Sequence, residues 1–281
     1  MRASLLAVFA HPDDETLRCG GTLAKYAALG ADVHLICLTR GEMGRNTDPT
    51  LSDVNLPTQR ERELQEACRL LGIHSPIFLG YHDSGRADRL QRDDPLTTIN
   101  ADPIEMERRI LDVIERTRPQ VMVTFDPHGM YGHPDHLVAH RVATAAYASS
   151  GFKQVRVQRL FYTVQSREEM ERLQSPGHQG GQPLGVLNGL APETYAVCGC
   201  TIAAEIDIHE FAARKRAALF AHRTQTGPHS TLGRLSEMQL QPLLERETFS
   251  FGGIRGPVTE YPLTDLFAGL QVGWTAQKGS P

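Results

Sequence analysis

Short apolar runs alternate with amphipathic stretches through the first half of the chain. Five stretches are nearly continuous in apolar residues, which is typical of strands buried on both faces: residues 4–10, 32–39, 76–80, 120–126 and 159–164. Between them, apolar residues at helical spacing predict four helices: residues 22–30, 58–73, 102–119 and 133–149. Strands that alternate with crossover helices form a parallel sheet with helices on both faces. The pattern therefore predicts an α/β, Rossmann-like fold with a mostly parallel sheet.

The second half of the chain is less regular. Residues 175–194 are rich in Gly, Pro and Gln, which predicts a long loop and a candidate lid. Residues 205–225 predict a short strand followed by a helix. We expect a single domain over residues 1–281, with a Rossmann-like core over residues 3–165. An irregular C-terminal lobe over residues 166–281 would complete the substrate pocket.

Composition narrows the class of protein. A chain of 281 residues is long enough to bury a full core. Its net charge of −4 implies no strongly basic face, so nucleic acid is not an expected partner. No apolar run approaches the roughly 18 residues that span a bilayer, and the first run is shorter than the core of a secretory signal. We expect a cytoplasmic protein with no membrane partner, and the irregular second half leaves surface for a homo-oligomer.

The cysteines do not suggest a disulfide framework. Their number is odd and their spacing irregular: Cys19, Cys37, Cys68, Cys198 and Cys200. We expect reduced thiols packed in or near the core, because the single C-x-C has no second pair to complete a zinc site.

Residues able to do chemistry follow four of the predicted strands. They lie in four segments: residues 11–15, 39–44, 81–85 and 126–136. Parallel sheets of this class bind ligands at the carboxyl ends of their strands, so these segments should meet at one edge. This convergence predicts a functional site there.

Histidine and carboxylate side chains in these loops suggest a divalent-metal site. His11, Asp14 and His136 would supply the three protein ligands of a catalytic zinc, which lowers the pKa of its water to roughly 7. Asp13 would remain free to accept a proton as general base. Each element alone has a simpler interpretation, since paired acids often cap helices or form turns. His136 and His140, one helical turn apart, form a competing ligand pair that spacing does not exclude.

The motifs themselves resemble a known family. "AHPDDE" near the N-terminus, "LTRGEMG" after the second strand and "YGHPDH" after the fourth are similar to the PIG-L/LmbE-like zinc-dependent deacetylases. The similarity extends through "QRERELQEACRLLGI", "GYHDSG" and "KRAALFAHRTQ". Members of that family hydrolyse the N-acetyl group of N-acetylglucosamine derivatives, including intermediates of mycothiol, bacillithiol and glycosylphosphatidylinositol synthesis.

The resemblance implies a role for each matching residue. His11, Asp14 and His136 match the metal ligands, and Asp13 matches the general base. His133 matches the imidazole that stabilises the oxyanion and protonates the leaving amine.

Further matches surround this centre. Asp135 would orient His133 and favour its positively charged form. Tyr131 resembles the mobile tyrosine that polarises the amide carbonyl. Arg60 and Asp83 resemble positions that hold sugar hydroxyls or a polar aglycone, although a helix-face ion pair and an Asx turn explain them equally well. The glycine-punctuated loop offers further substrate contacts: Arg40, Glu42 and Arg45.

Taken together, these features predict a metal-dependent N-deacetylase acting on a small N-acetylated amino sugar. Zinc is the expected cofactor, with iron(II) or another divalent metal as the alternative. A related amidase acting on a thiol-sugar conjugate would share the site. A non-catalytic sugar- or metal-binding module would need neither Asp13 nor His133 beside the ligands.

Overall fold

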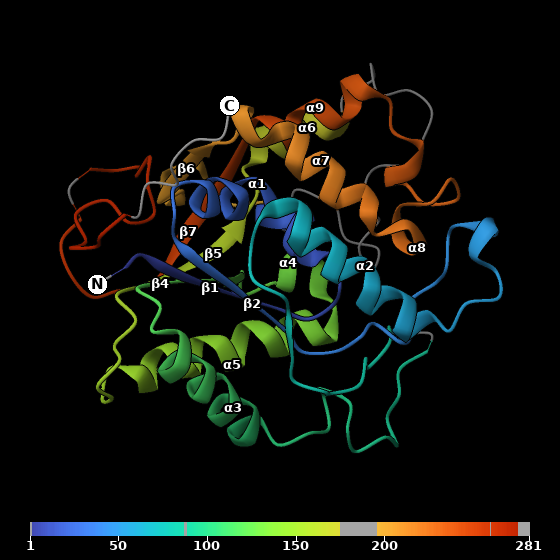
Figure 1. Ribbon diagram of the computed structural model, residues 1–281, viewed down its shortest axis with the longest axis horizontal. Coiled ribbons are helices and arrows are strands. Elements are labelled where there is room, and N and C mark those ends of the chain that lie inside the picture. The colour runs from blue at the N-terminus through green and yellow to red at the C-terminus, as the bar shows by residue number, and fades with distance from the viewer. Residues whose placement is uncertain (1, 87–88, 175–195, 259, 275–281) are drawn as a thin grey trace.

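The chain folds around one twisted sheet, shown in the computed structural model of Figure 1. The structure describes residues 2–86, 89–174, 196–258 and 260–274. Within these residues the sheet has seven strands in the order β3-β2-β1-β4-β5-β7-β6. The strands are β1 (Ser4–Phe9), β2 (Asp32–Cys37), β3 (Ile77–Phe78), β4 (Val121–Phe125), β5 (Arg159–Val164), β6 (Ala204–Asp207) and β7 (Arg246–Ile254).

Helices cover both faces of the sheet (Figure 1). Helices α1, α2 and α7 pack together on one face, and α3 and α5 pack together on the other. The described helices are α1 (Asp14–Ala28), α2 (Leu56–Leu71), α3 (Pro103–Thr117), α4 (Gly129–Gly132), α5 (Pro134–Ser150), α6 (Arg167–Gln174), α7 (Ala212–Ala221), α8 (Arg223–Thr226) and α9 (Glu237–Glu245).

The predicted parallel strands are confirmed. Strands β1 to β5 pair in parallel, and the side chains of β1 and β4 are buried throughout. Helix α1 is longer than the predicted helix over 22–30, because it begins at Asp14 and continues through a kink at Cys19. Strand β7 was not predicted, and it pairs antiparallel with both β5 and β6.

The strand order fixes where a site can form. β1 lies between β2 and β4, so the chain moves to one side of β1 through β2 and β3 and then returns to its other side at β4. Such a reversal leaves a crevice outside the carboxyl ends of the two central strands. The "AHPDDE" segment follows β1 and the "YGHPDH" segment follows β4, so both segments reach this crevice.

The C-terminal part of the chain is more regular than its sequence indicated. β6 and β7 belong to the same sheet as the core strands, and α7 packs against α1 and α2. The predicted loop over 175–194 lies outside the described residues. Cys19, Cys37 and Cys68 are buried as expected, but Cys198 and Cys200 are exposed, and all five thiols are free.

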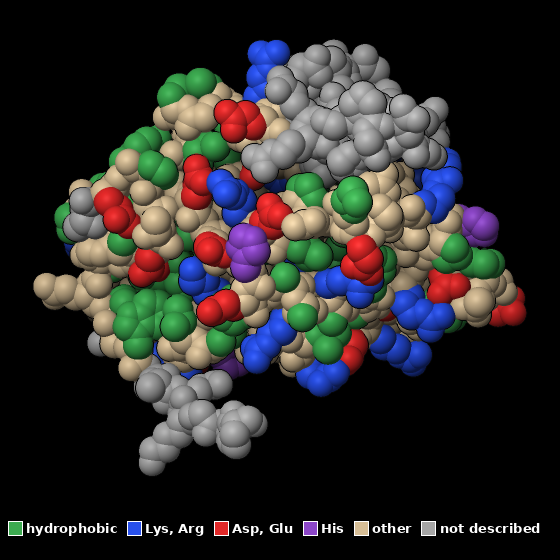
Figure 2. Space-filling model, turned by 90° about the horizontal axis from the view of Figure 1, so that it is seen from above, with side chains coloured by type: hydrophobic (Ala, Val, Ile, Leu, Met, Phe, Trp, Pro, Cys, Tyr) green, Lys and Arg blue, Asp and Glu red, His purple; other side chains and the backbone are tan. Residues whose placement is uncertain are grey.

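The surface over α6, α7 and α9 carries acidic and basic side chains interspersed (Figure 2). None of the described helices combines the length and apolar character needed to cross a bilayer. The cytoplasmic location and a homo-oligomeric state stay predictions.

His34 on β2 makes fold stability depend on pH. Its ring stacks on that of His74 with the ring centres 4.4 Å apart. Burial, and then the neighbouring His74, lower the pKa of His34 to about 4. A histidine pKa that is lower in the folded chain stabilises the fold above the ordinary value of about 6.5, and this stability is lost as the pH falls from there towards 4.

We therefore expect His34→Gln to lose less stability on acidification than the wild type. The measurement is urea unfolding of both proteins at about pH 7.5 and about pH 4.5. The exposed His229 offers a control, since His229→Gln should behave like the wild type. Equal losses in wild type and His34→Gln would contradict the expectation.

Candidate active site

A cavity of about 480 Å³ opens at the carboxyl ends of the central strands. Its size suits a small organic ligand. The predicted residues that line it are His11, Asp13, Asp14, Arg45, Arg60, Asp83, Tyr131, His133 and His136. The loops predicted to converge therefore do so.

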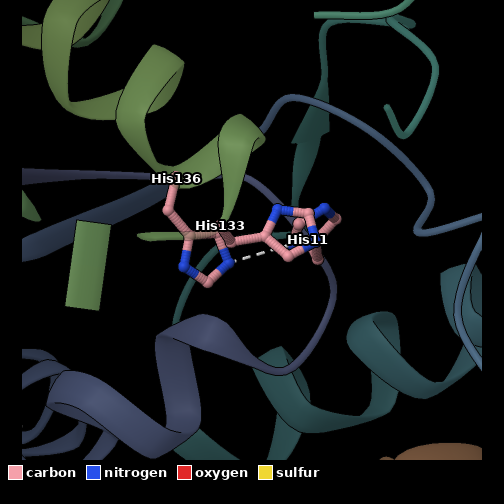
Figure 3. Close-up of side chains that lie close together, drawn as sticks. All are labelled: His11, His133 and His136. Atoms are coloured by element: carbon pink, nitrogen blue, oxygen red, sulfur yellow. Dashed lines mark hydrogen bonds between the residues drawn. The ribbon is translucent and has the colours of Figure 1, made fainter. Parts of the chain in front are cut away.

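Three side chains bring donor atoms together in this cavity. His11 follows β1, Asp14 begins α1 and His136 lies in the first turn of α5. The His11 Nδ1 and His136 Nε2 atoms are 3.1 Å apart. The Asp14 carboxylate lies 3.5 Å from His11 Nδ1 and 3.3 Å from His136 Nε2. In Figure 3 a dashed line joins the rings of His136 and His11, which come from the two segments.

One nitrogen of each of these two rings makes a hydrogen bond, which leaves the other nitrogen able to bind a cation. His11 Nε2 lies 2.9 Å from Asp135 Oδ2, and His136 Nδ1 lies 3.0 Å from the Gly129 carbonyl oxygen. Both partners only accept hydrogen bonds, so these nitrogens carry the protons and His11 Nδ1 and His136 Nε2 offer lone pairs. Two lone pairs and a carboxylate facing one another repel unless a positive charge lies between them.

The spacing of the donors also fits a metal. Bonds of about 2.0–2.1 Å at tetrahedral angles place two ligand atoms about 3.3 Å apart, close to the separations observed. Burial opposes a charge on His11, but Asp83 and the other acids outweigh it and hold the pKa of His11 well above its ordinary value. The site therefore favours a second proton, and with it a positive charge, on His11. A metal ion would take the place of this proton.

A third imidazole, that of His133, lies near the same point. Its ring nitrogen and those of His11 and His136 lie within 4.8 Å of one another. However, the Asp135 backbone N–H donates to His133 Nδ1 at 3.3 Å, which places the ring proton of a neutral His133 on Nε2. A protonated Nε2 is a hydrogen-bond donor and not a ligand, so His11, Asp14 and His136 form the better ligand set.

The charge state predicted for His133 is wrong. Burial, followed by the charges of His11 and His136, lowers the pKa of His133 to about 2, so the ring is neutral. The Asp135 carboxylate was expected to hold the ring charged, but it bonds to His11 Nε2, the Ser84 backbone N–H and the Thr98 hydroxyl. Asp135 is thus placed to orient His11, as carboxylates commonly orient metal-binding imidazoles.

Asp13 lies beside the ligands with its carboxylate free of them. The side chain is 29% exposed and lines the cavity. Burial raises the pKa of Asp13 to about 6, although the nearby Arg60 opposes the shift. A carboxylate with a pKa this close to neutrality is a stronger base than an ordinary aspartate.

Arg60 joins two loops beneath Asp13. Its guanidinium donates to the Pro12 carbonyl at 2.7 Å and to the Gly41 carbonyl at 2.9 Å, and lies 3.4 Å from the Asp13 carboxylate. Gly41 has φ +67°, and a Cβ at this position would lie 2.1 Å from Arg60 Nη1, so only glycine fits. Arg60 is therefore a buried support of the cavity wall, and because it also lines the cavity, its predicted contact with substrate stays a prediction.

The Asp83 carboxylate is also held by hydrogen bonds within the protein. It accepts from the backbone N–H groups of Met43 and Gly85, at 3.2 and 2.8 Å, so the Asx-turn interpretation holds. Asp83 also approaches one of the proposed ligand side chains, because His11 Nε2 lies 3.7 Å from Asp83 Oδ1. Burial raises the pKa of Asp83, but His11 and then the hydrogen bond from the Gly85 N–H outweigh it and hold the pKa well below the usual range.

Two other predicted substrate residues do not line the cavity. Arg40 pairs with Glu61 on α2 at 2.9 Å and lies over the Phe78 ring. Glu42 accepts from the Asp83 backbone N–H at 3.0 Å, so it supports that loop. Their predicted contact with substrate is therefore wrong, because the loop turns both side chains towards its own neighbours.

Tyr131 faces His136 from the segment after β4. Its ring centre lies 5.1 Å from that of His136, and burial raises its pKa to about 12, so the phenol keeps its proton. The Arg86 guanidinium lies 5.1 Å above the Tyr131 ring. Arg86, Arg89 and Gln225 line the cavity but were not predicted as site residues, although Gln225 ends the quoted "KRAALFAHRTQ" motif.

The competing ligand His140 is directed elsewhere. Its Nδ1 lies 2.9 Å from the Phe125 carbonyl oxygen, and its ring packs on Tyr162. His140 does not line the cavity. The pair His136 and His140 is therefore not brought together as a ligand set.

Comparison with known proteins places this site in a family. The profile described as PIG-L, GlcNAc-PI de-N-acetylase, matches residues 6–147, which is half of the chain. A 1D-myo-inositol 2-acetamido-2-deoxy-α-D-glucopyranoside deacetylase of Actinosynnema mirum is 38% identical, over 95% of this chain and 96% of its own. The chain belongs to the PIG-L family. The family inferred from the motifs and the N-deacetylase class are thereby confirmed.

Solved structures of other proteins share the fold. The N,N'-diacetylchitobiose deacetylase of Pyrococcus horikoshii is 21% identical with a TM-score of 0.55, over 88% of this chain and 83% of its own. A 4-carboxy-2-hydroxymuconate hydratase of Pseudomonas putida KT2440 is 22% identical with a TM-score of 0.59, over 92% of this chain and 99% of its own. Because a hydratase has the same fold, the fold alone does not fix the reaction.

Proposed function

We propose that this protein is a zinc-dependent deacetylase that hydrolyses the N-acetyl group of an inositol glycoside of N-acetylglucosamine. The observation that carries the proposal is the cluster of His11, Asp14 and His136 beside the separate carboxylate of Asp13, within a cavity of about 480 Å³. The full-length relative named for this substrate supports the choice of sugar.

The metal would be held by His11 Nδ1, the Asp14 carboxylate and His136 Nε2. Two imidazoles and one carboxylate are a usual ligand set for catalytic zinc and leave a further coordination position open. Such a metal polarises a carbonyl oxygen and lowers the pKa of water. Asp135 behind His11 and the Gly129 carbonyl behind His136 fix the orientation of the two rings.

Asp13 would remove the proton of the attacking water. Its carboxylate faces the cavity and is not needed as a ligand, and a pKa of about 6 suits a base that works near neutral pH. The protonated Asp13 can then return the proton to the amine as the amide C–N bond breaks. This return matters because an unprotonated amine is a poor leaving group.

His133 and Tyr131 would stabilise the oxygen of the acetyl group. The neutral His133 offers Nε2–H, and Tyr131 keeps its hydroxyl proton, so both can donate hydrogen bonds to an oxygen on which negative charge develops. Whether His133 also passes a proton to the amine stays a prediction. Beyond the reacting centre, Arg45, Arg86 and Gln225 line the part of the cavity available to the sugar and its aglycone.

The proposal is tested by assaying the zinc-loaded protein with a panel of N-acetylated compounds. The panel holds the inositol glycoside, N-acetylglucosamine, diacetylchitobiose and an N-acetylated thiol-sugar conjugate. We expect acetate and free amine in equal amounts, with kcat/KM for the inositol glycoside more than about tenfold above that for N-acetylglucosamine, which corresponds to about 1.4 kcal/mol of aglycone binding.

Two other outcomes of this assay would contradict the proposal. A higher kcat/KM for the thiol-sugar conjugate would replace the proposed substrate with that of a conjugate amidase. Binding of all compounds without release of amine would identify a sugar-binding module and end the proposal.

A further inference from the structure

Asp13 has an unusual backbone conformation. Its φ of 123° and ψ of −27° lie where L residues are rarely found. Conformations of this kind persist only where the surrounding structure imposes them, and they gather at functional sites. The orientation of the Asp13 carboxylate therefore depends on whatever holds this peptide.

Hydrogen bonds hold both backbone groups of Asp13. Its carbonyl oxygen accepts from the Thr16 hydroxyl at 2.9 Å and from the Leu17 N–H at 3.1 Å, within the first turn of α1. Its N–H donates to Glu15 Oε2 at 3.0 Å. The Glu15 bond is the one that fixes the residue ahead of the helix, because a helix leaves its first N–H groups without intrahelical partners.

Glu15 is in turn held from the far end of the chain. Its other oxygen, Oε1, lies 2.8 Å from Nε2 of His222, which follows α7. Both side chains are fully buried. The Glu15 carboxylate thus bridges the Asp13 backbone and the His222 ring, and this imidazole limits its rotation.

His222 is itself fixed beside the cavity. Its carbonyl oxygen accepts from the backbone N–H groups of Gln225 and Thr226, and from the Thr226 hydroxyl. Gln225 lines the cavity. The turn that carries His222 is therefore part of the cavity wall as well as the support of Glu15.

We propose that Glu15 and His222 are positioning residues for the base: together they hold the Asp13 peptide in its strained conformation and so aim its carboxylate. The inference rests on the proposed function in one respect, namely that Asp13 takes the proton in the reaction. Neither residue lines the cavity, so neither is expected to contact the substrate.

The chain contains a matched control for this pair. Lys215 on α7 and Glu247 on β7 form another fully buried ion pair, with Nζ 2.8 Å from Oε1. Glu247 also accepts from the backbone of α1, at Gly21 and Thr22, just over two helical turns beyond Asp13. Glu15 and Glu247 therefore both join the C-terminal part of the chain to α1, but only Glu15 bonds to Asp13.

The first test compares Glu15→Gln with Glu247→Gln. Both should lower the melting temperature, because each removes a buried charge from an ion pair. Glu15→Gln should lower kcat by roughly tenfold to a hundredfold with KM and zinc content unchanged, as expected when a catalytic group is misplaced. Glu247→Gln should keep kcat within about twofold of the wild type. Equal effects of the two variants on kcat would overturn the proposal.

The second test varies the imidazole. His222→Gln keeps a donor that can reach Glu15, whereas His222→Leu keeps only the volume, so kcat should fall further in His222→Leu. Equal kcat in the two variants would count against a positioning role for His222. Far-UV circular dichroism would establish that both variants are folded.

A third readout does not depend on activity. Hydrogen exchange at the Asp13 amide should be slow in the wild type and in Glu247→Gln, and faster in Glu15→Leu, whose side chain cannot accept from this N–H. If the wild type releases no amine from any substrate, the proposed function fails while the exchange data still test the bond. If the amide exchanges equally in all three proteins, the positioning inference fails whatever the activity.

Discussion

Replacing Asp13 with asparagine should lower kcat by about 10²–10⁴-fold, the range that general acid–base catalysis contributes. The change keeps the size of the side chain and removes its ability to accept a proton. Burial raises the pKa of Asp13 to about 6, so the wild-type carboxylate is mostly ionised at neutral pH and the asparagine cannot take over its role. Zinc content should be unchanged, because the proposed ligands are His11, Asp14 and His136.

The measurement is steady-state kinetics on the preferred substrate together with elemental analysis of bound metal. Asp94→Asn is the control, since Asp94 pairs with His82 at 2.8 Å and does not line the cavity. An Asp13→Asn protein that keeps full metal and a wild-type rate would remove Asp13 from the mechanism. One that loses its metal would instead identify Asp13 as a ligand.

Replacing a proposed metal ligand should lower activity about as much as replacing Asp13, but through loss of the metal. His136→Gln keeps a side chain of similar size but replaces the imidazole whose Nε2 lies 3.1 Å from His11 Nδ1 and 3.3 Å from Asp14. We expect zinc affinity to fall by more than about 100-fold, above the range seen for residues that only support a ligand. Activity should be lost with the metal.

Chelation and reconstitution separate this effect from misfolding. The wild type stripped with a chelator should lose activity and recover it with added zinc, and recovery with iron(II) in place of zinc would change the assignment of the metal. His140→Gln is the matched control, one helical turn along α5, because His140 bonds to the Phe125 carbonyl outside the cavity. If His140→Gln lost the metal and His136→Gln kept it, the ligand set would be wrong.

The position of the site could be predicted from the sequence because topology determines it. Buried strands are recognisable from their apolar runs, and the carboxyl ends of parallel strands meet at one edge whatever the details of packing. The residues after β1 and β4 therefore had to approach each other. This is why His11, Asp14 and His136 converge as the sequence suggested.

The partner of a side chain within the site was harder to predict. Asp135 follows His133 by two residues, but residues two apart at the start of a helix point in different directions. The Asp135 carboxylate therefore meets His11, 124 positions away, and not the neighbouring imidazole. Arg40 was misassigned for a similar reason, since its loop directs it to Glu61 on α2.

Strand β7 escaped prediction because its sequence lacks a continuous apolar run. "RETFSFGGI" mixes charged, hydroxyl and glycine residues. Its glycines make sense only in the folded protein: a Cβ at Gly253 would lie 2.2 Å from the Tyr147 ring of α5. Such close approach depends on tertiary contacts that local pattern does not report.

The place of β7 in the sheet has a consequence for how the protein is made. β7 lies between β5 and β6, yet it is the last of the described strands to leave the ribosome. Until Ile254 has been synthesised, one side of β5 has no neighbour and its backbone groups are open to pairing with other chains. We therefore expect the nascent chain to be most prone to aggregation late in translation, when binding by a chaperone would protect it most.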